Sequence, residues 1–100
     1  MSGSILVERG ISAARRAELG VDGWPVWKDG VGERTLTQDA AEKSYFLAGV
    51  ATLTQEGEEP VTVRAGDLAI IPAGACRWEV KADVRRHYRS DALSDRKSVV

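Results

Sequence analysis

The stretch that decides the fold is Gly66-Asp-Leu-Ala-Ile-Ile-Pro-Ala-Gly74. Its apolar run, Leu68–Ile71, is preceded by a Gly-Asp turn and followed by Pro72 and Gly74. A short apolar run between turn signals is typical of a β-strand that is buried on both faces. The stretch therefore predicts a strand inside an all-β domain, with a tight turn at each of its ends.

Strand signals recur on both sides of this stretch. The other apolar or alternating runs are Trp24–Trp27, Glu42–Leu47, Val50–Gln55, Val61–Arg64, Cys76–Val80 and Val84–Arg89. Residues 28–32 are expected to form a turn, and a polar stretch over 33–41 leads into the run at Glu42. Together the runs predict about seven or eight strands at intervals of roughly ten residues, a spacing that indicates a β-sandwich or barrel.

The only helical signal lies near the N-terminus. Ser12 can cap a helix over Ala13–Leu19, which consists of good helix formers, and Gly20 is placed to end it. A helix of about two turns is marginal alone and needs a surface to pack against. The fold class is therefore expected to be all-β with one short N-terminal helix.

The length of 100 residues leaves room for a single small domain. We expect that domain to span residues 1–89, with an N-terminal arm and helix in residues 1–20 and the barrel in residues 24–89. Residues 90–100 have the charged, weakly apolar composition of a flexible tail.

The composition excludes several classes of protein. One His and one Cys cannot supply a disulfide framework, a four-ligand Cys/His zinc site or a three-His metal site. The net charge of −1 lacks the basic excess of a nucleic-acid-binding protein, and no apolar run approaches the ~20 residues that span a membrane. The N-terminus does not resemble a signal peptide. We expect a cytoplasmic protein without nucleic-acid or membrane partners.

The alternation of side chains along a strand assigns faces to the expected strands. Cys76, Trp78 and Val80 are apolar and should point into the barrel, whereas the run Tyr45–Leu47 is apolar on both faces. A strand that is buried on both faces needs a cover on its outside. The N-terminal arm and helix could provide that cover, or a second subunit could, and we expect a symmetric homodimer.

Glu42 shares a face with Ser44 and Phe46. If that face is the interior, a carboxylate lies at the mouth of the barrel and needs a partner, because an unpaired buried carboxylate keeps its proton. The alternative is a solvated glutamate at the strand end, beside Lys43. The sequence leaves both readings open.

The placement of His87 depends on the hairpin that is expected after Val80. A two-residue loop puts His87 opposite Trp78, on the inner face with Cys76, and a three-residue loop puts it opposite Arg77; no turn signal decides between them. Arg85, Arg86 and Arg89 follow the same hairpin. They could bind an anion, but we expect them to form a solvated strand edge.

Two blocks of the sequence carry a family resemblance. Gly66–Gly74 matches the G(x)5PxG half of the second cupin motif, and Glu42–Gly49 matches the E(x)6G end of the first. Over roughly residues 15–90, the chain resembles the small single-domain cupins, particularly those related to the (S)-ureidoglycine aminohydrolase cupin domain. The resemblance implies a cupin-type antiparallel β-barrel, or jelly roll.

The resemblance also implies a metal site, and the sequence departs from it. The two histidine positions before Glu42 hold Leu36 and Gln38 in one alignment, and Thr35 and Thr37 in the other. The third histidine position holds Arg77, or Cys76 if the loop is one residue shorter, and the final Asn position holds Lys81. A single carboxylate does not hold a first-row metal firmly. No metal or other cofactor is expected, and weak binding of a divalent metal stays open.

The favoured function is a cupin-fold protein that binds a small polar metabolite in the barrel without a firmly bound metal. The candidate ligand-binding residues are Gln38, Tyr45, Phe46 and Trp78, and the candidate catalytic residues are Glu42, Cys76 and His87. One alternative is an enzyme, either ureidoglycine aminohydrolase-like or metal-free, with Glu42 or His87 as base and Cys76 as nucleophile. Another is a non-catalytic cupin that binds a protein partner.

Overall fold

Two long antiparallel strands form the centre of the molecule. A computed structural model describes residues 4–91 of the chain. The two long strands are β4, Glu42–Gln55, and β7, Gly74–Ser90, and they pair with each other from Glu42 to Gln55. The other elements are β1 (Leu6–Glu8), α1 (Ala13–Leu19), the 3₁₀ turn η1 (Val21–Gly23), β2 (Val26–Asp29), β3 (Gly32–Gln38), β5 (Val61–Arg64) and β6 (Leu68–Ile71).

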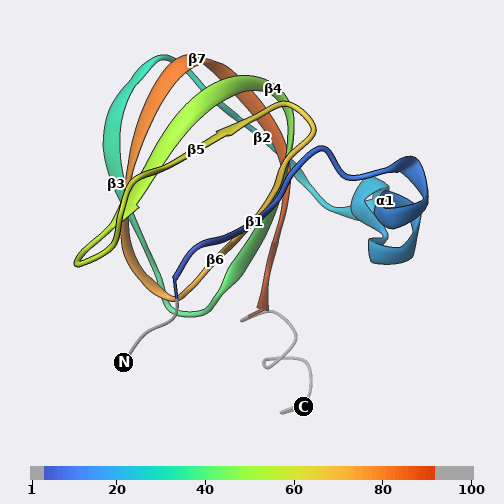
Figure 1. Ribbon diagram of the computed structural model, residues 1–100, viewed down its shortest axis with the longest axis horizontal. Coiled ribbons are helices and arrows are strands. Elements are labelled where there is room, and N and C mark those ends of the chain that lie inside the picture. Colours follow the sequence, from blue (N-terminus) through green and yellow to red (C-terminus); the bar gives the residue numbers. More distant parts are fainter. Residues whose placement is uncertain (1–3, 92–100) are drawn as a thin grey trace.

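All strands belong to one antiparallel sheet with the order β1-β6-β4-β7-β2; β3 also pairs with β7, and β5 with β4. Figure 1 shows the sheet curled round a single interior, with α1 outside it at one side. The expected fold class, an all-β antiparallel barrel with one short helix, is confirmed. Within residues 4–91, no helix has the length and apolar content that crossing a membrane requires.

The helix is confirmed at both ends. The Ser12 hydroxyl accepts a hydrogen bond from the backbone N–H of Arg15 at 3.0 Å, and Gly20 adopts a left-handed conformation with φ of 73°. These are the caps that the sequence predicts, and both act within a few residues of the helix. The 3₁₀ turn that follows was not expected, and β2 begins at Val26 rather than at Trp24.

Three expectations about the strands are wrong. The expected hairpin after Val80 does not exist, because β7 runs unbroken to Ser90. The polar stretch at 33–41, for which no strand was expected, contains most of β3, which pairs with β7 from Gly32 opposite Val80 to Gln38 opposite Gly74. The expected turn at 28–32 starts late, because Lys28 and Asp29 belong to β2. The barrel was expected to end at residue 89, but β7 continues to Ser90. The expected flexible tail over 90–100 lies outside the described residues from 92 onward.

Two strands expected separately around Gly49 form the single strand β4. Its register against β7 shifts between Phe46 and Ala51, as in a β-bulge. Gly49 lies in this irregular segment with φ of 96°. A Cβ atom at this position would lie 2.2 Å from the carbonyl oxygen of Asp83. The glycine therefore allows the backbones of the two long strands to approach each other closely.

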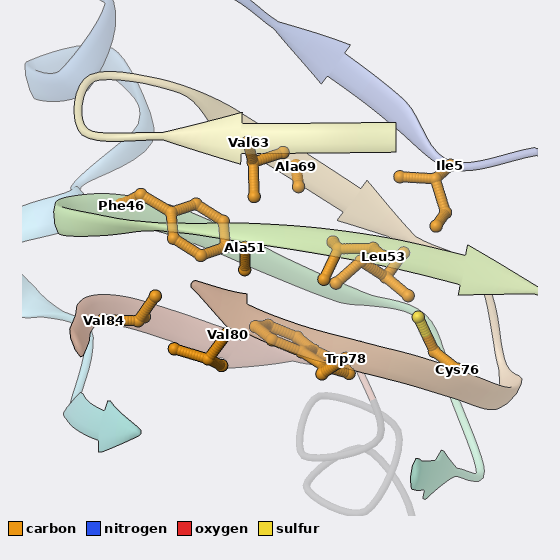
Figure 2. Packing of buried hydrophobic residues seen from close by; sticks show 11 residues of the cluster. Ile5, Phe46, Ala51, Leu53, Val63, Ala69, Cys76, Trp78, Val80 and Val84 are labelled. Atoms are coloured by element: carbon orange, nitrogen blue, oxygen red, sulfur yellow. The ribbon is translucent and has the colours of Figure 1, made fainter. Parts of the chain in front are cut away.

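The barrel interior is a single apolar cluster (Figure 2), in which side chains from β4 and β7 face each other. Its buried members are Ile5, Phe46, Ala51, Leu53, Val63, Ala69, Ile71, Cys76, Trp78, Val80 and Val84. The prediction that Cys76, Trp78 and Val80 point inward is confirmed. The alternation continues through Val84 because β7 does not turn.

A second apolar cluster covers the outer face of the barrel near α1. Buried Val21 and Trp24 pack there with Tyr45 and Leu68, and Leu19 from the helix adds to it. The run Tyr45–Leu47 was expected to be covered on its outer side by the N-terminal arm and helix or by a second subunit. The N-terminal segment therefore provides such a cover. The homodimer stays a prediction.

Asp67 fastens the N-terminal arm to the turn before β6. Its buried carboxylate accepts hydrogen bonds from the backbone N–H groups of Gly10 at 3.0 Å and Arg64 at 3.2 Å, and pairs with the Arg9 guanidinium at 2.8 Å. Burial raises the pKa of the Asp67 carboxyl, but the bonds from Gly10, Arg9 and Arg64 outweigh burial and hold the pKa below its usual value.

This lowered pKa gives a pH dependence. The folded protein favours the ionised form of Asp67 more than the unfolded chain does. The contribution of Asp67 to folding stability is therefore complete above the unfolded pKa of about 3.9 and is lost as the pH falls through the lower folded pKa. We expect Asp67→Asn to cost about 1–3 kcal/mol at pH 7 in urea unfolding, and the difference from wild type to shrink towards pH 3. Glu59→Gln, an exposed position, is the control. A pH-independent difference would contradict this account.

Candidate functional site

A cavity of about 280 Å³ opens at the end of the barrel where β3 ends and β4 begins. Side chains from β2, β3, β4 and β7 line it, and they combine aromatic, amide, hydroxyl and charged groups. The lining residues are Trp27, Leu36, Thr37, Gln38, Glu42, Arg86 and Tyr88. This end of the barrel is therefore polar, in contrast to the apolar cluster behind it.

The central contact of this site is an ion pair between Glu42 and Arg86. The Arg86 Nη1 atom donates to Glu42 Oε2 at 2.6 Å and to Ser44 Oγ at 2.8 Å, and the Ser44 hydroxyl donates to the same carboxylate oxygen at 3.1 Å. The Arg86 side chain is only 5% exposed. Of the two readings of Glu42, the enclosed carboxylate with a partner is confirmed, and the solvated strand end is wrong.

A second carboxylate bears on the same guanidinium. Asp29 Oδ2 lies 3.6 Å from Arg86 Nε, while Asp29 Oδ1 accepts from Arg34 Nη1 at 3.0 Å and from the Trp27 indole at 3.1 Å. The two carboxylates, of Glu42 and Asp29, thus balance the two guanidinium groups. We call these four side chains the ion network.

The expectation that Arg86 lies on a solvated strand edge is wrong. β7 is a central strand, with β4 on one side and β2 and β3 on the other. Because β7 does not turn back, its even-numbered positions keep facing inward, and Arg86 follows Val84 into the interior. Arg85 and Arg89 are exposed, as expected.

Aromatic rings surround the Arg86 guanidinium. Its central carbon lies 4.6 Å from the centre of the Trp78 ring and 5.6 Å from that of Tyr88. Tyr88 meets Trp27 edge to face, with ring centres 6.4 Å apart. Trp27 is 51% exposed, so its ring lies at the opening of the cavity. Cation–π contacts of this kind stabilise a desolvated guanidinium by about 1–2 kcal/mol.

Several buried polar atoms of the site make no hydrogen bond. Among residues 4–91, the buried side-chain atoms without a hydrogen bond are Asp29 Oδ2, Gln38 Oε1, Trp78 Nε1 and Arg86 Nε. Folded proteins satisfy the large majority of such groups. All four atoms belong to the cavity lining, to the ion network or to the ring packed on Arg86, so hydrogen-bonding capacity is concentrated at this place.

The structure brings some candidate residues together and separates others. Glu42 and Gln38 line the cavity. Phe46 and Trp78 lie in the apolar core, where Trp78 contacts the site through Arg86. Tyr45 was expected to face the barrel but packs on the outer face, under the guanidinium of Arg16. The reason is its odd position in β4, next to inward-facing Phe46.

His87 lies on the outer side of β7 with Tyr45. Neither of its two expected registers exists, since β7 forms no hairpin: His87 pairs with Val26 and with Tyr45. Its Nδ1 atom lies 2.9 Å from the carbonyl oxygen of Trp24. His87 therefore does not meet Glu42 or Cys76, and the three candidate catalytic residues do not form one constellation.

Cys76 is fully buried in the core. Burial raises the pKa of its thiol to about 11, a hydrogen bond with the backbone of Thr54 lowers it, and the charge of Glu42 raises it further. At neutral pH the group is a thiol, whereas a nucleophilic cysteine must be a thiolate.

We expect the folded protein to resist alkylation at Cys76. At pH 7, a pKa of about 11 leaves roughly one molecule in ten thousand as thiolate, far fewer than for a free cysteine. Iodoacetamide labelling, followed by mass spectrometry, should therefore be at least about 100-fold slower in buffer than in urea. Labelling of the folded protein at the rate of a free thiol would restore the nucleophile hypothesis.

The donor set does not fit a firmly held metal. Leu36 has no ligand atom, Gln38 offers one amide, and the Glu42 carboxylate is already neutralised by a guanidinium. No group of three His, Cys, Asp or Glu side chains is gathered for metal binding within residues 4–91. Divalent first-row metals need several such donors. In this barrel, the neighbour of the Glu42 carboxylate is the Arg86 guanidinium and not a further metal-binding side chain.

Comparisons with known proteins agree on the fold. A family model described as the EutQ-like cupin domain matches residues 16–88. The chain is similar to a crystal structure of a DUF861 family protein from Thermotoga maritima, with a TM-score of 0.81 and 33% sequence identity, covering 87% of this chain and 99% of that one.

Two further solved structures match in part. A protein of unknown function (DUF1255) from Acidithiobacillus ferrooxidans has a TM-score of 0.61 and 31% identity over 63% of this chain and 61% of its own. A putative ethanolamine utilization protein Q from Salmonella typhimurium has a TM-score of 0.57 and 25% identity over 63% of this chain and 51% of its own. A search among curated proteins found no match.

Proposed function

This chain belongs to the EutQ-like cupin domain family, and we propose that it binds a small polar metabolite at the mouth of its barrel without a firmly bound metal. One observation carries the proposal: Arg86, a charged side chain only 5% exposed, lines an open cavity while its Nε atom has no hydrogen-bond partner. A ligand that enters the cavity would lie beside this guanidinium.

The energetics of burial support a ligand site. Buried ion pairs recover little or none of the cost of removing two charges from water, and apolar side chains of similar volume often stabilise a fold better. The opposite part of the interior is filled with apolar side chains. An ion network with unsatisfied atoms at one end of the barrel is therefore a feature expected of a functional site rather than of packing.

The size of the cavity limits the ligand. Small-molecule sites usually occupy about 300–1,000 Å³, and this cavity, at about 280 Å³, is slightly smaller than that range. The half-exposed Trp27 ring supplies an apolar wall at the opening. A compact metabolite with a few polar groups fits these dimensions.

The proposal is tested by a thermal-shift screen of small metabolites with two matched variants. A compound present at 100 times its Kd adds about 2.7 kcal/mol of stability and should raise Tm by roughly 10 °C. We expect Trp27→Ala, at the opening, to weaken a compound found in this way at least tenfold. Val26→Ala is the control, since Val26 is the neighbour of Trp27 in β2 and does not line the cavity.

Two outcomes would contradict the proposal. One is a broad screen in which no compound stabilises the wild type, or in which Trp27→Ala and Val26→Ala bind equally well. The other is metal found in stoichiometric amount in the purified protein, or a large rise in Tm with Mn²⁺, Zn²⁺, Fe²⁺ or Ni²⁺. The ureidoglycine aminohydrolase-like activity is not part of the proposal, because no alignment places a histidine at the expected ligand positions. These positions hold Leu36 and Gln38 or Thr35 and Thr37, followed by Arg77 or Cys76.

A further inference from the structure

The charges at the cavity are already balanced. Of the residues that line it within the described chain, only Glu42 and Arg86 are charged, and they form a 2.6 Å pair. The wider ion network adds Asp29 and Arg34, whose charges also cancel. A carboxylate brought to Arg86 would meet two carboxylates that hold it now, and an ammonium group would meet the guanidinium. Either ligand would have to break an existing pair, which is costly in a buried site.

The uncharged polar groups of the lining suit a ligand that both donates and accepts hydrogen bonds. Gln38 lines the cavity with an amide group, which donates through its nitrogen and accepts through its oxygen. The hydroxyl of Thr37, also in the lining, can do either. A carboxylate ligand only accepts and an ammonium ligand only donates, whereas neighbouring hydroxyl groups do both.

From these two features we propose that the ligand is an uncharged polyhydroxy compound, an alditol or a monosaccharide, held through its hydroxyl groups by Gln38 and Thr37 beside the Arg86–Glu42 pair. This rests on the function proposed above. The C–H face of such a compound would pack against the Trp27 ring, which meets Tyr88 edge to face at the opening. The cavity volume of about 280 Å³ suits a chain of five or six carbons.

The test uses compounds that share a carbon skeleton and differ in charge. The series consists of the pentitols and hexitols with their aldoses, the corresponding aldonates, and the corresponding 1-amino-1-deoxyalditols; propionamide represents an uncharged ligand with an amide instead of hydroxyl groups. Binding to the full chain is followed by two-dimensional ¹H–¹⁵N NMR of the indole N–H groups of its three tryptophans.

The tryptophans provide an internal control. Trp27 lies at the opening and Trp78 packs on Arg86, while Trp24 belongs to the outer cluster. We expect at least one alditol or aldose to shift the Trp27 signal saturably without moving that of Trp24, and the aldonate of the same configuration to bind at least tenfold more weakly. A rise in Tm alone is insufficient, because polyols stabilise proteins non-specifically by exclusion from the surface.

A pair of variants in β3 connects binding to the cavity. Gln38→Leu should weaken the alditol or aldose at least tenfold, and Thr35→Val, at an exposed position outside the lining, should not. Equal or tighter binding of an aldonate, an aminodeoxyalditol or propionamide at Trp27 would overturn this inference and leave the function proposed above in place. If no compound in this series or in the broader metabolite screen moves the Trp27 signal, both fall.

Discussion

Arg86→Met is expected to lower the free energy of unfolding by about 3–5 kcal/mol, because it leaves the buried Glu42 carboxylate and the Ser44 hydroxyl without their common donor. The guanidinium also holds Asp29 at 3.6 Å and packs on Trp78 at 4.6 Å. The measurement is urea unfolding at pH 7, followed by circular dichroism. The loss is a large part of the 5–15 kcal/mol that stabilises an ordinary small domain.

Arg85→Met is the matched control, since Arg85 is the exposed neighbour of Arg86 in β7; it should change stability by no more than about 0.5 kcal/mol. Combining Arg86→Met with Glu42→Gln should recover part of the loss, and the resulting double-mutant cycle should show a coupling of about 1–3 kcal/mol. Equal effects of the two arginine variants would mean that the pair does not lie in the interior. If Arg86→Met does not fold, recovery of folding in the double variant is the deciding result.

Gly49→Ala is expected to destabilise the protein by about 2–5 kcal/mol, through two separate costs. The φ of 96° costs an L-residue about 1–2 kcal/mol. The added Cβ would lie 2.2 Å from the Asp83 carbonyl oxygen, which forces β4 and β7 apart and adds the cost of overpacking, about 1–3 kcal/mol. The midpoint of urea unfolding measures the sum.

Gly57→Ala separates the two costs. Gly57 has a similar φ of 81°, but nothing lies within 4 Å of the Cβ it would gain. We expect Gly57→Ala to cost only the backbone term of about 1–2 kcal/mol, so the difference between the variants measures the close approach of the strands. If both variants cost the same, the approach at Asp83 is relaxed without penalty.

Local sequence signals correctly predicted those features of the fold that depend on residues close together in the chain. Ser12 and Gly20 cap the helix between them, and the alternation Cys76, Trp78, Val80 correctly assigns the inner face of β7. The enclosed position of Glu42 followed from the same alternation, as one of two readings. Each of these features is determined over a few residues of chain.

The features that the sequence did not reveal depend on distant partners. Residues 81–83 are exposed and polar enough to suggest a loop, yet they continue β7 because β4 pairs beside them at Val50 opposite Ala82. The polar and charged residues of β3 gave no strand signal, since the inner face of a strand is normally apolar. Here that face carries Arg34 and Gln38 because it meets the polar end of the barrel. Because the expected hairpin left its loop length open between two and three residues, the sequence did not decide on which side of the sheet Arg86 lies.

The central position of β7 also has a consequence for the order in which the protein folds during its synthesis. In the described chain, β2 and β3 pair with no strand other than β7. A growing chain that has emerged only as far as residue 73 therefore lacks the strand with which β2 and β3 pair. The parts of the cavity lining that these two strands contribute cannot yet form. Pairing across such long separations is slow. We expect these two strands to remain unpaired until residues 74–90 leave the ribosome, so the barrel closes late and as a unit.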